Sequence, residues 1–192
     1  MLMRRIIWTV IVTAWTAAAA AATEDCSGGK PAAEAPAALQ DFAFLIGRWR
    51  IDLKRQTANG WSPPRPQHAL WTGRYALDGM AIYDEWFDTA PDLAPATPRG
   101  ANLRVYNSET KQWLMTWIHT SGLTATTLTA ERRGDAMIMW QSHPTGPAWE
   151  AEFIVESADR WTRTQYQIDE NGERSAQYLL IATRLPCTDS TD

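Results

Sequence analysis

From Gly47 onward, the chain is a succession of short segments in which apolar and polar residues alternate, and this pattern constrains the fold more than any other feature. Alternation with a period of two is typical of strands that have one buried and one solvated face. The first such segment follows the apolar residues 42–46 and places Trp49, Ile51 and Leu53 on one face. No helical pattern of any length interrupts the series. The pattern therefore predicts an all-β domain.

Turn signals that contain glycine separate the segments. Asp78-Gly79 is typical of a tight hairpin, because both residues tolerate the positive φ that a two-residue turn needs. Asn59-Gly60, Arg133-Gly134 and Asn171-Gly172 belong to the same class. About ten strands are predicted, at residues 47–55, 67–77, 80–88, 100–106, 112–120, 123–131, 136–142, 147–156, 160–168 and 175–184. Such short links favour an antiparallel meander that hides its edges by closing into a barrel, behind a short helical turn at 42–46.

The first 22 residues have the parts of a secretory signal peptide: the basic residues Arg4 and Arg5, an apolar core, and alanines before the expected cleavage after Ala22. The apolar run is too short for a good membrane span, and no second run follows. We therefore expect an exported protein, periplasmic or secreted, without a membrane span. Residues 23–40 are predicted to be a flexible Ala/Pro-rich linker, residues 41–186 the barrel domain, and residues 187–192 a C-terminal tail.

Charge argues against two classes of partner. Removal of the signal peptide takes away two basic residues and no acid, which leaves 16 basic against 22 acidic residues, a net charge of about −6 at neutral pH. A chain of this sign, without a local block of basic residues, is not expected to bind nucleic acid or an anionic membrane surface. The sequence says nothing about oligomeric state.

Two cysteines remain in the mature chain, Cys26 near its start and Cys187 near its end. Because an exported protein meets oxidising conditions, an even number of cysteines favours a disulfide. In a closed barrel the first and last strands are neighbours, so the flanking segments could meet. Two free thiols are the alternative.

Aromatic residues are spread over nearly every predicted strand. The chain has 11 tryptophans, of which Trp8 and Trp15 leave with the signal peptide. In the segment 113–119, Trp113, Met115, Trp117 and His119 share one face. An interior lined in this way suits a flat apolar ligand, and a ten-stranded barrel is wider than the eight-stranded barrel that side chains can just fill. The alternative is that the rings simply fill the core.

Polar residues also lie in the middle of apolar strands, at alternating positions that could point inward. A buried charge must be paired, so an inward Arg104 or Arg163 would need Asp84 or a ligand carboxylate as its partner. One β-bulge would exchange the faces, so parity alone leaves the side of each residue open. The candidate cavity residues are Arg74, Asp84, Trp86, Arg104, Tyr106, Met115, Trp117, His119, Gln141, Arg163 and Gln165.

Several short pieces in a consistent order resemble one protein family. The segment Phe42-Ala-Phe-Leu-Ile-Gly-Arg-Trp49 resembles the start of DUF1579 proteins, and Leu77-Asp-Gly79, Leu103-Arg-Val-Tyr-Asn107 and Lys111-Gln-Trp113 match further pieces. The resemblance implies a lipocalin-like (calycin) β-barrel of uncharacterised function, with a possible ligand cavity. It also implies that Trp49, in the Gly-x-Trp motif of the first lipocalin strand, plugs the closed barrel end beneath an arginine of a late strand, for which Arg184 is the candidate.

Motifs of hydrolases, metalloproteases, phosphate loops and paired-cysteine metal sites are absent from the sequence. The three histidines, His68, His119 and His143, lie on separate predicted elements, so we expect no metal site, because zinc needs at least three protein ligands that converge. No cofactor is expected either. One histidine can nevertheless bind haem, as in the calycin-like nitrobindins, and His119 or His143 could do so.

Three functional hypotheses follow from these features. The first is binding of a small apolar or amphipathic ligand inside the barrel. The second is a haem-dependent or cofactor-free enzyme in the same cavity, with Asp84 and His119 as the acid–base pair to test. The third is a structural module whose core is filled.

Overall fold

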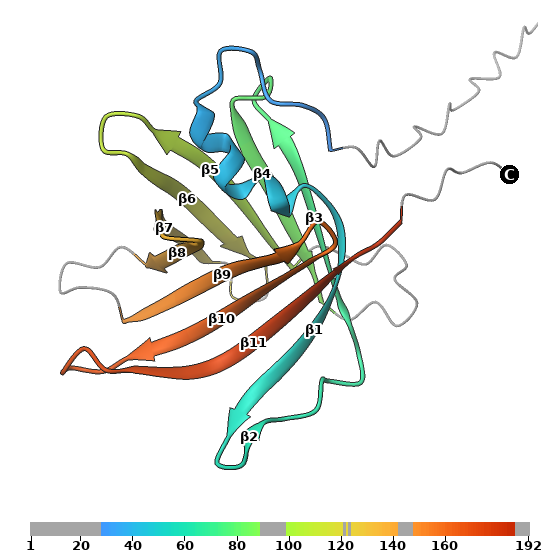
Figure 1. The fold of residues 1–192 in the computed structure, drawn as a ribbon, viewed down its shortest axis with the longest axis vertical. Coiled ribbons are helices and arrows are strands. Elements are labelled where there is room, and N and C mark those ends of the chain that lie inside the picture. Colours follow the sequence, from blue (N-terminus) through green and yellow to red (C-terminus); the bar gives the residue numbers. More distant parts are fainter. Residues whose placement is uncertain (1–27, 89–98, 121, 123, 142–147, 187–192) are drawn as a thin grey trace, which may run out of the picture.

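The computed structural model describes residues 28–88, 99–120, 122, 124–141 and 148–186. Each long strand pairs antiparallel with its neighbour in the chain, and β1 also pairs with β11, which closes the sheet into a barrel of ten strands (Figure 1). The predicted antiparallel meander barrel is confirmed. Its elements are η1 (Ala37–Leu45), β1 (Gly47–Thr57), β2 (Gly60–Trp61), β3 (Ala69–Ala76), β4 (Ala81–Phe87), β5 (Gly100–Asn107), β6 (Gln112–His119), β7 (Thr124–Arg133), β8 (Ala136–Gln141), β9 (Trp149–Ser157), β10 (Arg160–Ile168) and β11 (Arg174–Arg184).

The short strand β2 is an addition to the prediction and pairs only with the end of β1. The barrel closes through the register in which Trp49 of β1 lies beside Arg184 of β11 and Trp71 of β3. One end of the barrel, where β1 begins and β11 ends, carries the helix η1 (Figure 1). We call this the helix end, and the other the far end.

The 3₁₀-helix η1 inserts apolar side chains into the helix end of the barrel. Leu39, Phe42 and Leu45 are buried. The Phe42 ring meets Trp113 edge to face, with 5.0 Å between the ring centroids. Burial of this amphipathic segment joins it to the core formed by the strands, which is why the helix end is filled.

Two details of the N-terminal prediction change. The linker was predicted to extend to Gln40, but Leu39 belongs to the core, and the backbone N–H of Ala32 donates to the carbonyl of Gly79 at 3.1 Å. The helical turn was predicted at 42–46, whereas η1 extends from Ala37 to Leu45 and contains Asp41, whose carboxylate accepts a hydrogen bond from Nε of Arg132 at 2.8 Å. The helix begins earlier than predicted because its residue Leu39 packs against the core of the barrel.

Trp49 and Arg184 meet at the helix end. Trp49 is fully buried and donates a hydrogen bond from Nε1 to the Leu45 carbonyl at 3.1 Å. The guanidinium carbon of Arg184 lies 4.0 Å from the ring centroid of Trp49, a cation–π contact, and Nη1 donates to the carbonyl of Ile46 at 3.0 Å. Gly47 permits this approach, because its φ is +107° and a Cβ there would lie 2.7 Å from Nη1 of Arg184.

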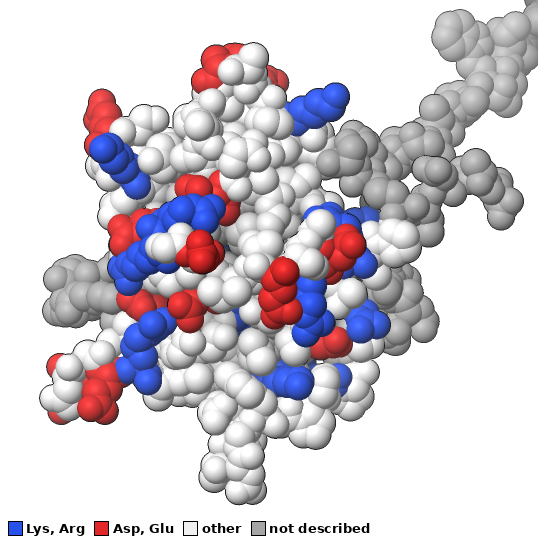
Figure 2. Space-filling view, viewed as in Figure 1, with Lys and Arg blue, Asp and Glu red and all other residues white. Residues whose placement is uncertain are grey.

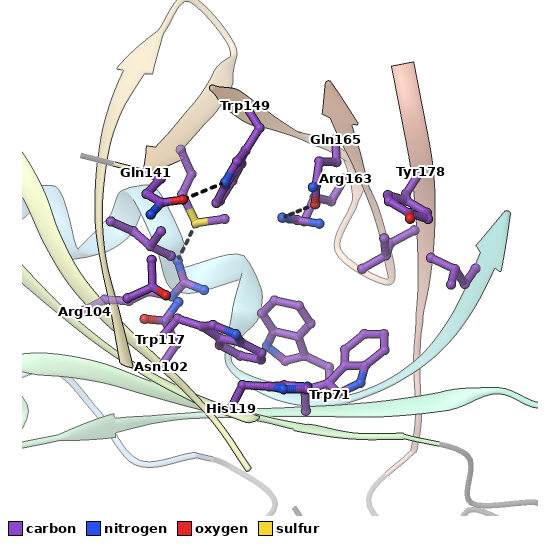
Figure 3. Close-up of a pocket in the computed structure, with 16 residues that line it drawn as sticks. Trp71, Asn102, Arg104, Trp117, His119, Gln141, Trp149, Arg163, Gln165 and Tyr178 are labelled. Atoms are coloured by element: carbon purple, nitrogen blue, oxygen red, sulfur yellow. Dashed lines mark hydrogen bonds between the residues drawn. The ribbon is translucent and has the colours of Figure 1, made fainter. Parts of the chain in front are cut away.

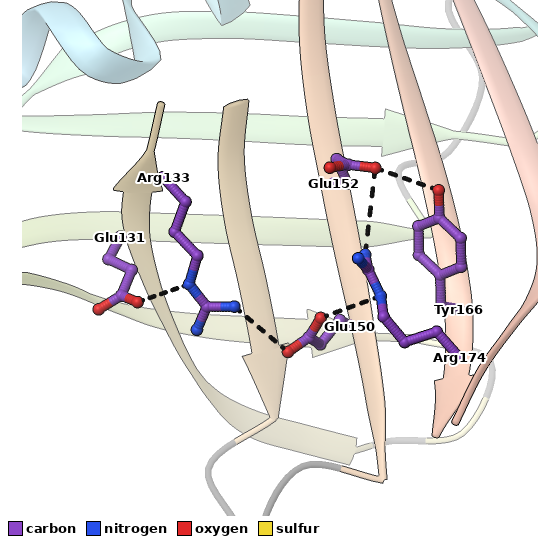
Figure 4. Close-up of polar contacts among 6 residues, drawn as sticks. All are labelled: Glu131, Arg133, Glu150, Glu152, Tyr166 and Arg174. Carbon is purple, nitrogen blue, oxygen red and sulfur yellow. Dashed lines mark hydrogen bonds and ion pairs between the residues drawn. The ribbon is translucent and has the colours of Figure 1, made fainter. Parts of the chain in front are cut away.

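Charged residues on the outer face of β7–β11 form a network of alternating sign (Figures 2 and 4). Glu150 lies between two arginines, with Nη1 of Arg133 at 3.6 Å and Nε of Arg174 at 3.3 Å. The hydroxyl of Tyr166 donates to Glu152 at 3.1 Å, and the Arg174 guanidinium carbon lies 4.0 Å from the Tyr166 ring centroid. We call Glu131, Arg133, Glu150, Glu152, Tyr166 and Arg174 the outer network.

Other predictions concern residues outside the described part of the chain. The signal peptide, Cys26, Cys187 and the C-terminal tail belong there, so the structure does not test the disulfide or export. Among the described residues, no helix is long and apolar enough to cross a membrane.

Candidate ligand-binding cavity

A cavity of about 400 Å³ occupies the barrel beyond the packed helix end (Figure 3). It extends toward the far end, since its lining includes His119 and Gln141, the last residues of β6 and β8, and Trp149, the first residue of β9. The lining consists of Leu53, Trp71, Trp86, Asn102, Arg104, Trp117, His119, Thr126, Leu128, Met139, Gln141, Trp149, Arg163, Gln165, Tyr178 and Leu180.

One side of the cavity, formed by β3–β6, is aromatic. Trp71 and Trp86 face each other on neighbouring strands, edge to face, with their centroids 6.0 Å apart. Trp117 and His119 stack on β6, also at 6.0 Å. Gly100 makes room for Trp117, because a Cβ there would lie 2.1 Å from the indole ring. We call Trp71, Trp86, Trp117 and His119 the aromatic side.

The opposite side, formed by β8–β10, carries polar groups (Figure 3). Nε1 of Trp149 donates to Oε1 of Gln141 at 3.2 Å. Nη2 of Arg163 donates to Oε1 of Gln165 at 3.2 Å. The cavity is therefore amphipathic, because the aromatic side on β3–β6 lies opposite these polar groups on β8–β10.

The floor of the cavity, toward η1, contains a buried ion pair. Nε of Arg104 donates to Oδ2 of Asp84 at 2.6 Å, and neither side chain is exposed to solvent beyond 1%. Nη1 of Arg104 donates to the sulfur of Met115 at 2.9 Å, and its guanidinium carbon lies 4.6 Å from the Phe42 ring centroid. The residues Arg104 and Phe42 thus join the ion pair to the packed helix end.

Burial shifts the pKa values of the charged groups inside the barrel. Burial raises the pKa of the Asp84 carboxyl above 3.8, and the charge and hydrogen bond of Arg104 offset part of that rise. Burial, and secondarily the charge of Arg104, lowers the pKa of Arg163 to about 10. Arg163 is enclosed by the barrel but only half-buried, because its side chain borders the cavity. It remains a cation at neutral pH.

Seven predicted cavity residues line the cavity, namely Trp86, Arg104, Trp117, His119, Gln141, Arg163 and Gln165. Four others do not. Asp84 lies behind Arg104, while Met115 and Tyr106 face the core, with the Tyr106 ring 5.6 Å from that of Trp113. Arg74 is exposed on the outer face of β3, where its guanidinium carbon lies 4.6 Å from the Tyr83 ring centroid.

Nine lining residues were not among the predicted ones: Leu53, Trp71, Asn102, Thr126, Leu128, Met139, Trp149, Tyr178 and Leu180. Strand parity carried a signal for several of them. Asn102 is two residues from Arg104 on the same strand, and Leu53 shares the face of Trp49. Parity indicated the inward face of these strands. It carried no information on how far η1 fills the barrel.

The structure describes two of the three histidines. His119 lines the cavity, whereas His68 lies on the outer face and contacts Asp52 through Nδ1 at 2.5 Å. His143 lies outside the described residues. Within the described part of the chain, no group of three or more His, Cys, Asp or Glu side chains could hold a metal ion.

The fold defines a class of protein, the antiparallel β-barrels closed at one end by a short helix, and solved structures share it. The S-type phycobiliprotein lyase CPES from Guillardia theta matches 77% of this chain and 92% of its own length, with a TM-score of 0.50 and 10% sequence identity. Rv2717c from M. tuberculosis matches 80% of this chain and 100% of its own, with a TM-score of 0.43 and 13% identity. At this identity the likeness to CPES concerns the fold alone. No family model matches the sequence, and no curated protein matches it.

Proposed function

We propose that this protein binds a small amphipathic ligand inside the barrel. The observation that carries the proposal is the cavity of about 400 Å³, with an aromatic side opposite a polar side. Ligand sites in proteins are typically concave, mostly apolar, and furnished with a few convergent polar groups, and they have volumes of about 300–1,000 Å³. The volume and the lining chemistry both agree with that description.

Side-chain packing differs between the two ends of the barrel, and this difference favours ligand binding over a filled core. At the helix end, η1 and the rings of Phe42, Trp113 and Phe153 pack against one another. Toward the far end, Trp86, Trp117 and Trp149 are only partly buried, because they border the cavity. Large rings that surround a space instead of closing it are suited to pack on a ligand.

The enzyme alternative receives less support. It paired Asp84 with His119, but Asp84 is held by Arg104 beneath the cavity floor and only His119 of the two lines the cavity. Of the two histidines considered for haem, His119 lines the cavity beside Trp117, and His143 lies outside the described residues. Haem binding is therefore one possible result of the ligand-binding measurements.

Nile red, a neutral solvatochromic dye, tests binding directly. We expect a blue-shifted, enhanced emission with the wild type and a strong loss of it for Trp117→Ala, which removes a ring from the aromatic side. Trp61→Ala is the matched control, because Trp61 lies on β2 and is absent from the lining. Equal dye binding by both variants, or none by the wild type, would contradict the proposal.

Two further measurements identify the cargo. Native mass spectrometry of protein purified from its own host should show a mass above that of the bare chain, which denaturation removes. Addition of haemin should produce no Soret shift. A Soret shift that disappears in His119→Ala would replace the amphipathic ligand with haem.

We also propose that the protein is a DUF1579-like protein that is exported to the periplasm or secreted, with Cys26 and Cys187 joined by a disulfide. The signal-peptide pattern of residues 1–22 and the two cysteines support this proposal. Intact mass of the exported protein, with and without reduction before alkylation, tests it. We expect a chain that begins at Thr23 and takes up two alkyl groups only after reduction.

A further inference from the structure

Three charged side chains are enclosed by the described part of the barrel near the cavity, and their charges do not cancel. Arg104 and Arg163 are cations, and Asp84 is the one carboxylate beside them. Positive charge therefore exceeds negative charge whether or not Asp84 carries a proton. A cation that borders the cavity without a carboxylate partner can pair with a negatively charged group of a ligand.

Asp84 is committed to Arg104. The two are joined at 2.6 Å, and both lie beneath the cavity with almost no exposed surface. Met115 and Met139 provide soft acceptors for Nη1 of Arg104, at 2.9 Å and 3.9 Å. Arg104 shields Asp84 from the cavity, since Arg104 belongs to the lining and Asp84 does not.

Arg163 is the cation without a carboxylate. Its Nη2 bonds to the neutral amide of Gln165, and its guanidinium carbon lies 5.6 Å from the Phe153 ring centroid. Among the described residues, no carboxylate lies within ion-pair distance of it, although every outer-network arginine has one within 4.0 Å. Figure 3 shows the guanidinium beside Gln165, across the cavity from the aromatic side.

Other polar atoms of the lining also lack partners. Nη2 of Arg104, Oδ1 of Asn102 and Nε1 of Trp71 are buried and make no hydrogen bond within the described residues. Five further buried atoms of the described chain, among them Nε1 of Trp113 and of Trp161, are also unbonded and lie outside the lining, so the position of a ligand headgroup is assigned from Arg163 alone.

We infer that the ligand is an amphipathic monocarboxylate, with its carboxylate on Arg163 and its apolar body against Trp71, Trp86 and Trp117. This inference rests on the proposed binding function and specifies its substrate class. An arginine binds a carboxylate through parallel N–H···O bonds, which a neutral ligand does not provide. With Asp84 ionised, one negative charge of the ligand balances the excess. A cationic ligand would be repelled by Arg163, and Arg104 keeps Asp84 out of its reach.

A pair of probes of equal shape tests the charge requirement. Naphthalene-2-acetate and naphthalene-2-acetamide differ in the carboxylate alone, and each is used to displace Nile red at neutral pH. We expect the carboxylate to bind the wild type roughly 10- to 100-fold more tightly, because hydrogen bonds to charged groups contribute enough for this ratio. Arg163→Met should reduce the ratio to near one, mainly by weakening binding of the carboxylate.

Arg74→Met is the matched control, because Arg74 is an arginine of the same barrel that lies on the outer face. It should preserve the full ratio. Arg163→Lys keeps the charge and loses the paired N–H groups, so an intermediate ratio is expected. Circular dichroism establishes that each variant is folded. The ratio of carboxylate to amide affinity in the wild type tests the charge requirement without any variant.

The outcomes separate the two proposals. Nile red that binds while the two probes bind equally would overturn the monocarboxylate and leave the binding function intact. Failure of Nile red and both probes to bind would overturn the binding function itself. A carboxylate preference that persists in Arg163→Met would overturn the assignment of the headgroup to Arg163.

Discussion

The arginines inside the barrel differ from those on its outer face in whether a carboxylate lies beside them. On the outer face, Arg133 and Arg174 each contact a carboxylate, and Glu150 is shared between them (Figure 4). Inside, Arg104 pairs with Asp84, while Arg163 donates to Gln165 and contacts the Phe153 ring, with no carboxylate of the described residues within 4.0 Å. Water screens an imperfect pairing on the outer face, whereas a charged side chain enclosed by the barrel depends more on partners within the protein. An incomplete set of charges therefore carries functional information inside the barrel and very little on its surface.

The largest effect is expected from breaking the interior pair. Arg104→Met should lower the free energy of unfolding by about 3–5 kcal/mol, because it leaves the Asp84 carboxylate buried without a partner. Urea denaturation at pH 7 measures this change. The double variant Asp84→Leu/Arg104→Met should recover most of the loss. A double variant as unstable as the single one would show that packing of Arg104, and not its charge, is what matters.

The same pair has a pH dependence of defined sign. Because the folded-state pKa of Asp84 is raised above 3.8, the folded protein binds this proton more tightly than the unfolded chain does. Its contribution to stability is therefore full below about pH 4 and is lost as the pH rises through the folded pKa. Asp84→Asn should flatten that part of the stability profile relative to the wild type, measured by urea denaturation between pH 4 and pH 8.

Arg163→Met should have the opposite sign to Arg104→Met. It removes a cation that has no carboxylate of the described residues within ion-pair distance, so the ligand-free protein should become more stable, by about 1 kcal/mol. Thermal and urea denaturation of protein stripped of ligand measure the difference. A loss of stability comparable to that of Arg104→Met would mean that Arg163 is a structural residue, and the comparison between the two arginines would fail.

On the outer face, the effects should be smaller and sensitive to salt. Glu150→Gln should cost about 1 kcal/mol, at the upper end for surface ion pairs, because Glu150 is only 8% exposed and meets two arginines. The loss should shrink at 1 M NaCl, while that of Arg104→Met should not, since salt screens exposed charges far more than buried ones. Equal salt dependence at the two sites would remove the distinction between them.

The smallest effect is expected from Tyr166→Phe, which removes the hydrogen bond to Glu152 and retains the ring beneath Arg174. We expect a loss of about 0.5 kcal/mol, the lower end for a hydrogen bond, because the pair is partly exposed. Burial, followed by the bond to Glu152, also raises the pKa of Tyr166. Tyr75 and Tyr83 also have raised pKa values, so in a spectrophotometric titration the tyrosinate step above pH 10 that moves to lower pH in Glu152→Gln should be the one that is missing in Tyr166→Phe.

Much of the fold could be predicted because its signals are local. Alternation along the 113–119 segment indicated that Trp113, Met115, Trp117 and His119 share a face, and in the structure they all point into the barrel. Asp78-Gly79 lies in the link between β3 and β4 with positive φ at both residues, although the link has four residues, 77–80, where two were predicted. Such patterns depend on one strand and its turn, so neighbouring residues are enough to read them.

The site could be predicted only in part, because it depends on depth inside the barrel. Met115 and Trp117 share one face of β6, yet the first is packed in the core and the second borders the cavity. The difference arises from η1, whose Phe42 reaches Trp113 and Arg104 but extends no farther. A second difficulty is to decide which face of a strand points inward. Arg74 was predicted to be a cavity residue, but it lies on the exposed face of β3.

The residue pattern alone was enough to specify an all-β chain, its turns, and the inward faces of most strands, because those features follow from periodicity and backbone preference. Closure between β1 and β11, the depth of η1, and the unequal partnering of Arg104 and Arg163 come from contacts between residues far apart in the chain. Those contacts leave a cavity with an excess of positive charge. A local pattern does not encode it, because both its volume and its charge balance are sums over the whole barrel.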